Sequence, residues 1–459
     1  MKKILLLLVL FWISCSRLDP PQLSGYLTTP DRSYLFQPVT FPQLVSDSIA
    51  DTIVIDTVQR FQTMDGFGFC LTGGSAMLLK TKLTDTARSQ LLQELLLDSA
   101  GIGVSYLRVS MGASDLDEKV FSYDDLPLGQ ADPELKKFSL AYDTLYLLPV
   151  LNEIVKLKPT IKIMASPWSA PAWMKDNGKV KGGKLLPQYY AAYATYFVRY
   201  IQAMAQEGIT LDAVTLQNEP ENPHNTPSML MTAEEQIDFV KNHLGPAFRS
   251  NNITTKIIVF DHNADHPEYP ITILNDAGAR EFIDGSAFHL YLGEVSALRK
   301  VHDAHPDKNI YFTEQWTSGQ GEFAGDLQWH VKNLIIGASR HWSKTVLEWN
   351  LANDPQFQPH TDDGGCTLCQ GALTIGDGVT RNVSYYIIAH ASKFVPPGSV
   401  RVASTEVTGL PNVAFLTPQR QTVLIVVNES STDKTFTLAG HGRGLNATLP
   451  AGAVATFVW

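Results

Sequence analysis

Short runs of β-branched and apolar residues alternate with longer amphipathic stretches from about residue 61 to residue 394. Runs of this length are typical of buried strands, and apolar positions three and four residues apart are typical of helices. A strand-then-helix alternation predicts an α/β fold with a parallel sheet. Eight strands are expected, at residues 63–71, 105–111, 160–166, 213–218, 256–261, 285–291, 309–314 and 345–350. Eight such units close naturally into a (β/α)8 TIM barrel.

The pattern changes at both ends of this region. After about residue 395 it becomes a series of short alternating runs separated by turn residues, which is typical of antiparallel strands. A further strand-like run covers residues 52–56. We therefore predict a β-sandwich-like side domain built from both chain ends, with N-terminal strands from residues 22–60, the barrel from residues 61–394 and the remaining strands from residues 395–459. No low-complexity linker separates the parts, so we expect them to pack rigidly.

The first residues have the pattern of an export signal. Two lysines precede an apolar run that ends near Ile13, which is too short to be a stable membrane anchor. The run leads into Ser14-Cys15-Ser16, which resembles a bacterial lipoprotein cleavage box. We interpret residues 1–15 as a signal peptide with a lipid-attachment site at Cys15, with simple secretion as the alternative. Both readings predict a secreted protein or a membrane-anchored lipoprotein, at the bacterial cell surface or in the periplasm.

Charge and cysteine content narrow the choice of partner. The formal net charge is −10 and no Lys/Arg cluster occurs, which argues against nucleic acid or an anionic membrane surface as the partner and favours a neutral substrate. Cys366 and Cys369 are close enough for a small disulfide loop, with free thiols as the alternative. One Cys-x-x-Cys with His360 supplies too few ligands for a recognised zinc site, so no metal or other cofactor is expected. Cys70, in a strand-like run, is expected to be a buried inert thiol.

Two glutamates carry the main indication of function. Glu219 and Glu314 each come just after a β-branched apolar run, with two further strand–helix units between them. In a parallel barrel both would stand at the carboxyl end of the strands, where active-site groups collect. Two facing carboxyl groups are the machinery of glycoside hydrolysis. We expect Glu219 to be the acid, with its pKa raised by the second carboxylate, and Glu314 to be the nucleophile.

Other strand ends supply candidate sugar contacts. Asn218, beside the first glutamate, could hold a sugar hydroxyl. Trp168, Trp316 and Trp349 follow three different strands, and indole rings pack on the C–H faces of sugars. Each tryptophan alone could be a loop anchor, whereas the group indicates a carbohydrate cleft.

At this point the chain resembles glycoside hydrolase family 30, the family of lysosomal glucosylceramidase. The resemblance is carried, in matching order, by residues 66–68, 107–115, 165–175, 217–220, 289–291, 313–314, 348–352 and 392–402. These segments span nearly the whole mature chain, and the last resembles the family's return into its β side domain.

The resemblance implies a retaining double-displacement mechanism, with Glu219 as acid/base and Glu314 as nucleophile. It also implies that four residues surround the sugar in the first subsite, namely Asp115, Trp168, Asn218 and Trp349. Tyr291 is expected beside the nucleophile. Arg108 is expected to help keep that carboxylate ionised.

One departure bears on the substrate. The family's glucosylceramidases usually follow Gly-Phe-Gly with Gly-Ala-x-Thr-Asp, whereas this chain has Gly73 in place of the acidic residue. In this respect it is closer to bacterial and fungal members that cleave β-1,6-glucan. We predict hydrolysis of β-D-glucosidic bonds in β-1,6-glucan or in glucosylceramide-type glucosides. A xylan-type glycosidase of the same family, or a non-catalytic carbohydrate-binding protein on the same scaffold, are the alternatives.

Overall fold

The computed structural model describes residues 23–41, 51–440 and 443–459 of the chain. The expected signal peptide, residues 1–15 with Cys15, lies outside these residues. Within the described part, no helix combines the length and the apolar character needed to cross a membrane.

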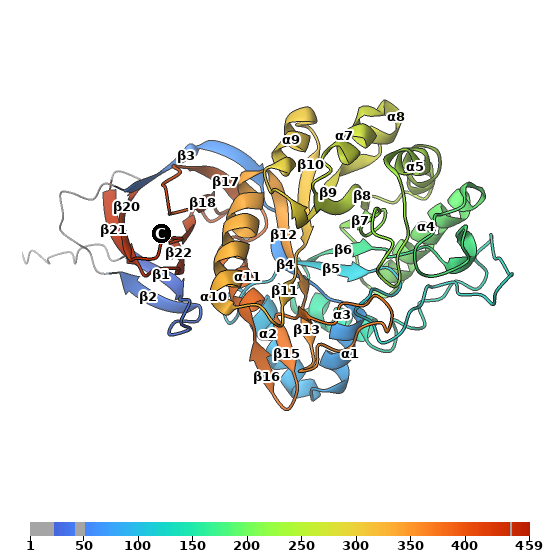
Figure 1. Ribbon diagram of the computed structural model, residues 1–459, viewed down its shortest axis with the longest axis horizontal. Helices are drawn as coiled ribbons and strands as arrows, with labels where there is room; N and C mark the ends of the chain where they lie inside the picture. Colours follow the sequence, from blue (N-terminus) through green and yellow to red (C-terminus); the bar gives the residue numbers. More distant parts are fainter. Residues whose placement is uncertain (1–22, 42–50, 441–442) are drawn as a thin grey trace, which may run out of the picture.

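A closed barrel of eight parallel strands forms the larger part of the molecule (Figure 1). Its strands are β4 (Gly66–Cys70), β5 (Tyr106–Ser110), β6 (Lys162–Ser166), β7 (Ala213–Thr215), β8 (Lys256–Ala264), β9 (Ile283–Gly293), β10 (Asn309–Glu314) and β12 (Ser343–Asn350). They pair in chain order, and β12 closes the ring against β4. Each strand predicted for the barrel is present, so the predicted TIM barrel is confirmed.

Helices surround the barrel and connect its strands. They are α1 (Gly73–Thr81), α2 (Asp85–Leu96), α3 (Leu147–Leu157), α4 (Tyr190–Gln206), α5 (Ala233–Phe239), α6 (Gly245–Ser250), α7 (Glu268–Asn275), α8 (Ala277–Arg280), α9 (Ala297–Ala304), α10 (Phe323–His330) and α11 (Val383–Ser392). Local sequence starts several of them: Thr72 caps α1, and Thr232 with Glu235 forms a capping box at α5. The long segment between β5 and α3 contains neither helix nor strand and builds one side of the barrel mouth.

The side domain is a nine-stranded sheet assembled from both chain ends. Its strands are β1 (Leu23–Thr28), β2 (Gln37–Phe41), β3 (Thr52–Thr63), β17 (Val400–Ser404), β18 (Asn412–Leu416), β19 (Thr422–Val427), β20 (Lys434–Gly440), β21 (Arg443–Leu449) and β22 (Val454–Val458). β3 pairs with β17 as far as Thr63, so the sheet reaches slightly further along the chain than residue 60. The predicted β-rich side domain from both ends is confirmed.

β19 shows how the side domain is attached to the barrel. Alternate residues of a strand point to opposite faces of the sheet. Val423, Ile425 and Val427 join the hydrophobic core of the barrel, whereas Leu424 and Val426 join the core of the side domain. A strand buried on both faces fixes the two parts to each other.

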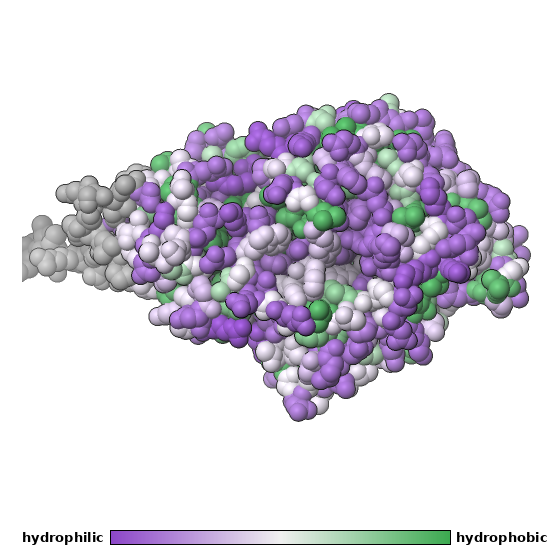
Figure 2. All heavy atoms as spheres, in the orientation of Figure 1, coloured by the Kyte–Doolittle hydropathy of each residue, from purple (hydrophilic) through white to green (hydrophobic). Residues whose placement is uncertain are grey.

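The helix α11 lies between the barrel and the side domain (Figure 1). Its fully buried His390 makes hydrogen bonds to Thr28 Oγ1 at 2.8 Å and to Thr456 Oγ1 at 2.9 Å, both in the side sheet. Figure 2 shows the same view, and on this face hydrophobic residues are scattered among hydrophilic ones.

Candidate active site

The two glutamates predicted from the sequence meet at one histidine ring. Nδ1 of His289 lies 3.2 Å from Glu219 Oε1 and 3.7 Å from Glu314 Oε1. Because both lengths run to one nitrogen, their sum is an upper limit on the distance between the two oxygens. That limit admits the ~5–5.5 Å of retaining glycosidases and excludes most of the ~6.5–9.5 Å range of inverting ones. The structure therefore brings together a carboxyl pair suited to double displacement.

Glu314 is held by two groups on barrel strands. Arg108 Nη1 donates to its Oε2 at 2.5 Å, and the hydroxyl of Tyr291 donates to its Oε1 at 2.9 Å. Glu314 ends β10 and its side chain is 7% exposed. Both carboxylate oxygens are therefore occupied, which fixes the direction of the side chain.

Arg108 connects three acidic or amide groups on neighbouring strands. Besides Glu314, its Nη2 donates to Asp261 Oδ2 at 2.8 Å and to Asn218 Oδ1 at 2.7 Å, while Nε donates to Ser166 Oγ. The guanidinium is fully buried. Burial disfavours the charge, but the attraction of Asp261 and Glu314 outweighs it and raises the pKa of Arg108.

Glu219 stands on a loop turn rather than on a strand. β7 ends at Thr215, and Glu219 adopts a left-handed backbone with φ 47°. Such a conformation costs about 1–3 kcal/mol in a non-glycine residue and recurs at functional sites. The amides of Asn222 and Asn225 donate to its Oε2 at 2.7 and 3.3 Å. His262 Nδ1 lies 3.8 Å from its Oε1.

The expected pKa of Glu219 is wrong in direction. Burial raises the pKa, but the hydrogen bond and positive charge of His289, the nearby His262 and the Asn222 amide together lower it below its usual value. The pKa of Glu314 is instead raised, because burial outweighs the attraction of His289 and Arg108. The imidazole of His289 lies between the two carboxyl groups, and its effect on Glu219 exceeds that of the second carboxylate. His289 itself is fully buried, and the surrounding carboxylates overcome that burial to raise its pKa to about 9.

Trp168 and Trp349 form an aromatic wall beside the carboxyl pair. Their rings stack with centroids 5.3 Å apart, and the Arg108 guanidinium lies over the Trp168 ring at 4.9 Å. Nε1 of Trp168 is buried and has no hydrogen-bond partner among the described residues. A buried donor without a partner is suited to a hydroxyl of a ligand. Trp316 packs at the edge of this cluster and is only partly buried.

Asp115 is tied to the loop that carries the disulfide. Its Oδ2 accepts a hydrogen bond from the backbone N–H of Cys366 at 3.2 Å. Cys366 and Cys369 are bonded to each other, so the predicted disulfide is confirmed. Cys70 is free and buried, as predicted. Burial and the negative charge of Glu314 raise the pKa of Asp115 to about 7.

Sequence reasoning missed three residues of the site: Asp261, His262 and His289. Asp261 follows the apolar run of β8, which is the placement that identified the two glutamates, so the same signal would have found it. His289 belongs to one of the segments that carry the family resemblance, and the sequence alone indicates no role for it. Its two ring nitrogens lie 3.2 Å from Glu219 Oε1 and 3.2 Å from Asp261 Oδ1, and this bridging only appears once β8 and β9 are side by side.

One group of residues in the described part of the chain could hold a metal ion. Ligand atoms of Glu219, His262 and His289 lie within 4.8 Å of one another. Both ring nitrogens of His289 already face carboxylates, so hydrogen bonding accounts for its placement.

Comparisons with known proteins agree with this geometry. The glycosyl hydrolase family 30 TIM-barrel model matches residues 64–395, and the model of that family's β-sandwich domain matches residues 398–457. An endo-1,6-β-D-glucanase of Aspergillus fumigatus is 34% identical over 425 residues, covering 86% of this chain and 85% of the relative.

Two further relatives extend the match. Lysosomal acid glucosylceramidase of Mus musculus is 28% identical over 435 residues, covering 89% of this chain and 83% of the relative. The solved structure of an endo-β-1,6-glucanase superposes with a TM-score of 0.89 at 34% identity, covering 95% of this chain and 99% of that one. The chain therefore belongs to glycoside hydrolase family 30.

Proposed function

We propose that this protein hydrolyses β-1,6-linked glucan with retention of configuration, using Glu314 as nucleophile and Glu219 as acid and then base. The observation that carries the proposal is the pair of carboxyl groups facing one nitrogen of His289. Binding alone would not require two buried carboxyls at the spacing of direct attack on an anomeric carbon.

In the first step, a carboxylate oxygen of Glu314 attacks the anomeric carbon while Glu219 gives a proton to the glycosidic oxygen. The bond to the leaving sugar breaks and a glycosyl ester on Glu314 forms. The contacts from Arg108 and Tyr291 hold the attacking carboxylate in place. Because the pKa of Glu219 is lowered, the proton donor is more abundant at acidic pH. We expect activity to be highest on the acidic side of neutrality.

In the second step, Glu219 takes a proton from a water molecule, which attacks the same anomeric carbon and releases Glu314. Two inversions restore the β configuration. The Asn222 amide and the imidazole of His289 both stabilise the carboxylate form that this step requires.

The choice of β-1,6-glucan over other β-glucosides follows the comparisons. The two relatives with 34% identity are named as endo-1,6-β-glucanases, and the glucosylceramidase is 28% identical. Gly73 in place of an acidic residue agrees with this choice.

The test is an assay of purified protein on linear β-1,6-glucan, glucosylceramide in detergent, and xylan, with NMR of the first products. We expect reducing sugar from β-1,6-glucan above the other two, with the β anomer appearing first. An α anomer would remove Glu314 from its role as nucleophile. Faster cleavage of glucosylceramide or xylan than of β-1,6-glucan would contradict the proposed substrate.

We also propose that the chain is exported and carries lipid at Cys15, on the strength of the N-terminal sequence pattern. Mass spectrometry of the protein from bacterial membranes should find the mature N-terminus at this cysteine with added acyl mass. A Cys15→Ser variant should move to the soluble fraction. An unmodified mature N-terminus at another position would indicate simple secretion.

A further inference from the structure

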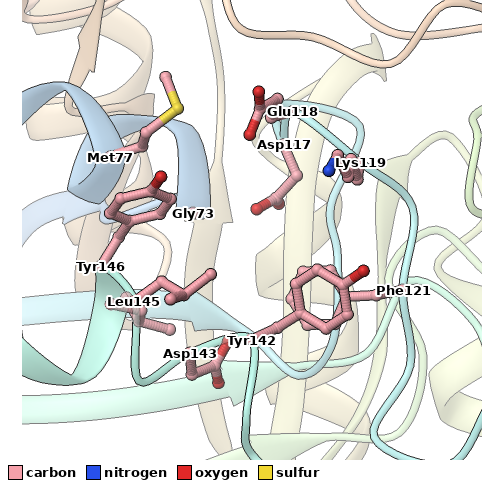
Figure 3. A pocket seen from close by; sticks show the side chains of 11 residues that line it. Gly73, Met77, Asp117, Glu118, Lys119, Phe121, Tyr142, Asp143, Leu145 and Tyr146 are labelled. Carbon is pink, nitrogen blue, oxygen red and sulfur yellow. The ribbon is translucent and has the colours of Figure 1, made fainter. Parts of the chain in front are cut away.

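A small pocket opens beside the barrel mouth, separate from the carboxyl pair. It is lined by residues of α1, of the segment that follows β5, and of the segment that leads into α3 (Figure 3). Six of the lining residues carry the argument: Gly73, Asp117, Phe121, Tyr142, Asp143 and Leu145. We call it the Asp117 pocket. Since α1 follows β4 and Asp117 follows β5, the pocket lies at the same end of the barrel as the catalytic glutamates.

The size of the Asp117 pocket suits one ring of a sugar. Its volume is about 150 Å³. A cavity of about that volume can hold a six-membered ring such as benzene. The pocket is also partly open to solvent rather than enclosed, so a longer chain bound there need not end inside it.

Asp117 presents one free carboxylate oxygen to this space. Its Oδ2 accepts from the N–H and hydroxyl of Ser114 at 2.7 and 2.8 Å, which fixes the side chain. Its Oδ1 has no donor among the residues that the structure describes, although the residue is only 5% exposed. A Cβ on residue 73 would stand 1.7 Å from this oxygen, so only glycine leaves room for it.

Asp143 supplies a second acceptor in the same pocket. Its Oδ2 accepts from the Tyr123 hydroxyl at 2.6 Å, and its other oxygen has no donor in the described part of the chain. The residue is 4% exposed. Both aspartates line the pocket, and neither of these oxygens is among the unpartnered side-chain atoms that are shielded from solvent. They are therefore acceptors that the hydroxyl groups of a ligand can reach.

The rim of the pocket carries exposed apolar groups. Tyr142 is 46% exposed and stacks on Phe121 with ring centroids 4.5 Å apart and an interplanar angle of 13°. Leu145, beside it, is 55% exposed. An open aromatic face next to buried hydrogen-bond acceptors is the combination that a pyranose ring requires, because one of its faces is C–H and its edge is hydroxyl.

A metal ion fits this pocket less well than a sugar. Within the described residues, the one group of three His, Cys, Asp or Glu side chains close enough to share an ion is that of Glu219, His262 and His289. The two aspartates therefore do not converge with a third ligand. Lys119 also lines the pocket and brings a positive charge to it.

We propose that the Asp117 pocket binds one glucosyl residue of the substrate chain at a subsite away from the bond that is cleaved. The inference rests on the proposed glucan substrate. It implies that long β-1,6-linked chains gain affinity from contacts that a single sugar in the catalytic subsite does not make.

The test uses two rim substitutions, Tyr142→Ala and Leu145→Ser, in a Glu314→Gln background that cannot turn over substrate. Tyr34→Ala is the control for the first, because Tyr34 is 41% exposed and lies outside the pocket. Leu128→Ser is the control for the second, because Leu128 is 95% exposed on the same long segment and does not line the pocket. All four sites are exposed, so the variants should fold, and thermal melting checks this.

Isothermal titration calorimetry measures the dissociation constants of two ligands. One is a linear β-1,6-gluco-oligosaccharide, and the other is a glucose-shaped iminosugar that fits only the catalytic subsite. We expect Tyr142→Ala to weaken the oligosaccharide about three- to tenfold, as loss of an aromatic contact predicts, with iminosugar affinity unchanged. Leu145→Ser should do the same to a smaller extent. If the two rim variants bind the oligosaccharide as tightly as the control variants do, the proposed subsite is wrong, and the glucanase proposal is unaffected. If the wild type neither cleaves nor binds β-1,6-glucan, the proposed function fails and this inference fails with it.

Discussion

The two carboxyl groups of the active site have contrasting surroundings. Glu314 ends a barrel strand and is held by Arg108 and Tyr291 from two other strands. Glu219 stands on a left-handed turn after its strand, with two histidines and two asparagine amides around it. A nucleophile needs one fixed direction of attack, whereas an acid/base must change protonation state during the reaction. The difference in surroundings matches this difference in roles.

His289 connects the two sides, because its Nδ1 faces both carboxyls and its Nε2 faces Asp261. Its positive charge lowers the pKa of Glu219 and opposes the effect of burial on Glu314. Substitutions around Glu314 should therefore have effects different from substitutions around Glu219. Substitution of His289, which contacts both carboxyl groups, should affect both.

The largest effect is expected on the Glu314 side. A Glu314→Gln substitution removes the nucleophile and should lower kcat on β-1,6-glucan by about 10⁴-fold or more. The control is Glu294→Gln, an exposed glutamate after β9, which should keep wild-type activity. Comparable activity in the two variants would show that Glu314 is not the nucleophile. If the wild type and the Glu314→Gln variant are equally inert while the glucan still binds, the binding-protein alternative is favoured.

A Glu219→Gln substitution should have a smaller effect that depends on the leaving group. General acid catalysis contributes about 10²–10⁴-fold, so kcat on glucan should fall by that factor. An aryl β-glucoside whose phenol leaves without a proton should lose less. Steady-state kinetics on both substrates measures the difference, and added azide should restore turnover by replacing the water that Glu219 activates. Equal losses on the two substrates would argue against the acid role.

His289→Gln tests the group shared by the two sides. A hydrogen bond to a charged group contributes about 1.5–3 kcal/mol, so kcat/KM should fall about 10- to 100-fold. Losing the imidazolium should raise the pKa of both Glu219 and Glu314, because it lowers both in the wild type. Both limbs of the pH profile of kcat/KM should therefore move to higher pH. If activity falls by the same factor at every pH and neither limb of the pH profile moves, the role of His289 is purely structural.

Of the four substitutions, Tyr291→Phe should have the smallest effect on activity, and it tests whether the surroundings of Glu314 act separately from those of Glu219. The hydroxyl of Tyr291 donates a hydrogen bond to Glu314 and lowers the pKa of that carboxyl, whereas the main groups that lower the pKa of Glu219 are His289, His262 and Asn222. The pKa of Glu314 is raised and that of Glu219 is lowered, so Glu314 sets the basic limb of the pH profile. Loss of the hydroxyl should move only this limb to higher pH, with about a tenfold fall in kcat/KM. The pH profile of this variant, set beside that of His289→Gln, distinguishes the two roles. Movement of the acidic limb, which follows Glu219, would contradict the separation of the two sides.

Much of the fold could be read from the chain because its signals are local. Strand and helix periods identified the eight barrel units, and the change of pattern near residue 395 identified the side domain. In the side sheet β1, β2 and β21 were not predicted individually. β2 and β21 are the two edge strands, and β2 shows only a weak alternation of buried and exposed residues. Strand-end placement found both glutamates for a similar reason: a parallel barrel collects strand ends at one mouth.

The chain by itself determined which side chains reach the barrel mouth, since that depends on where each apolar run ends. The tertiary structure alone decided the charge state of those side chains. The pKa of a buried carboxyl depends on which groups lie within a few ångströms of it, and the neighbours of Glu219 come from β8, from β9 and from the loop after β7. Residues 70 positions apart set that electrostatic balance, so no local pattern could have reported it.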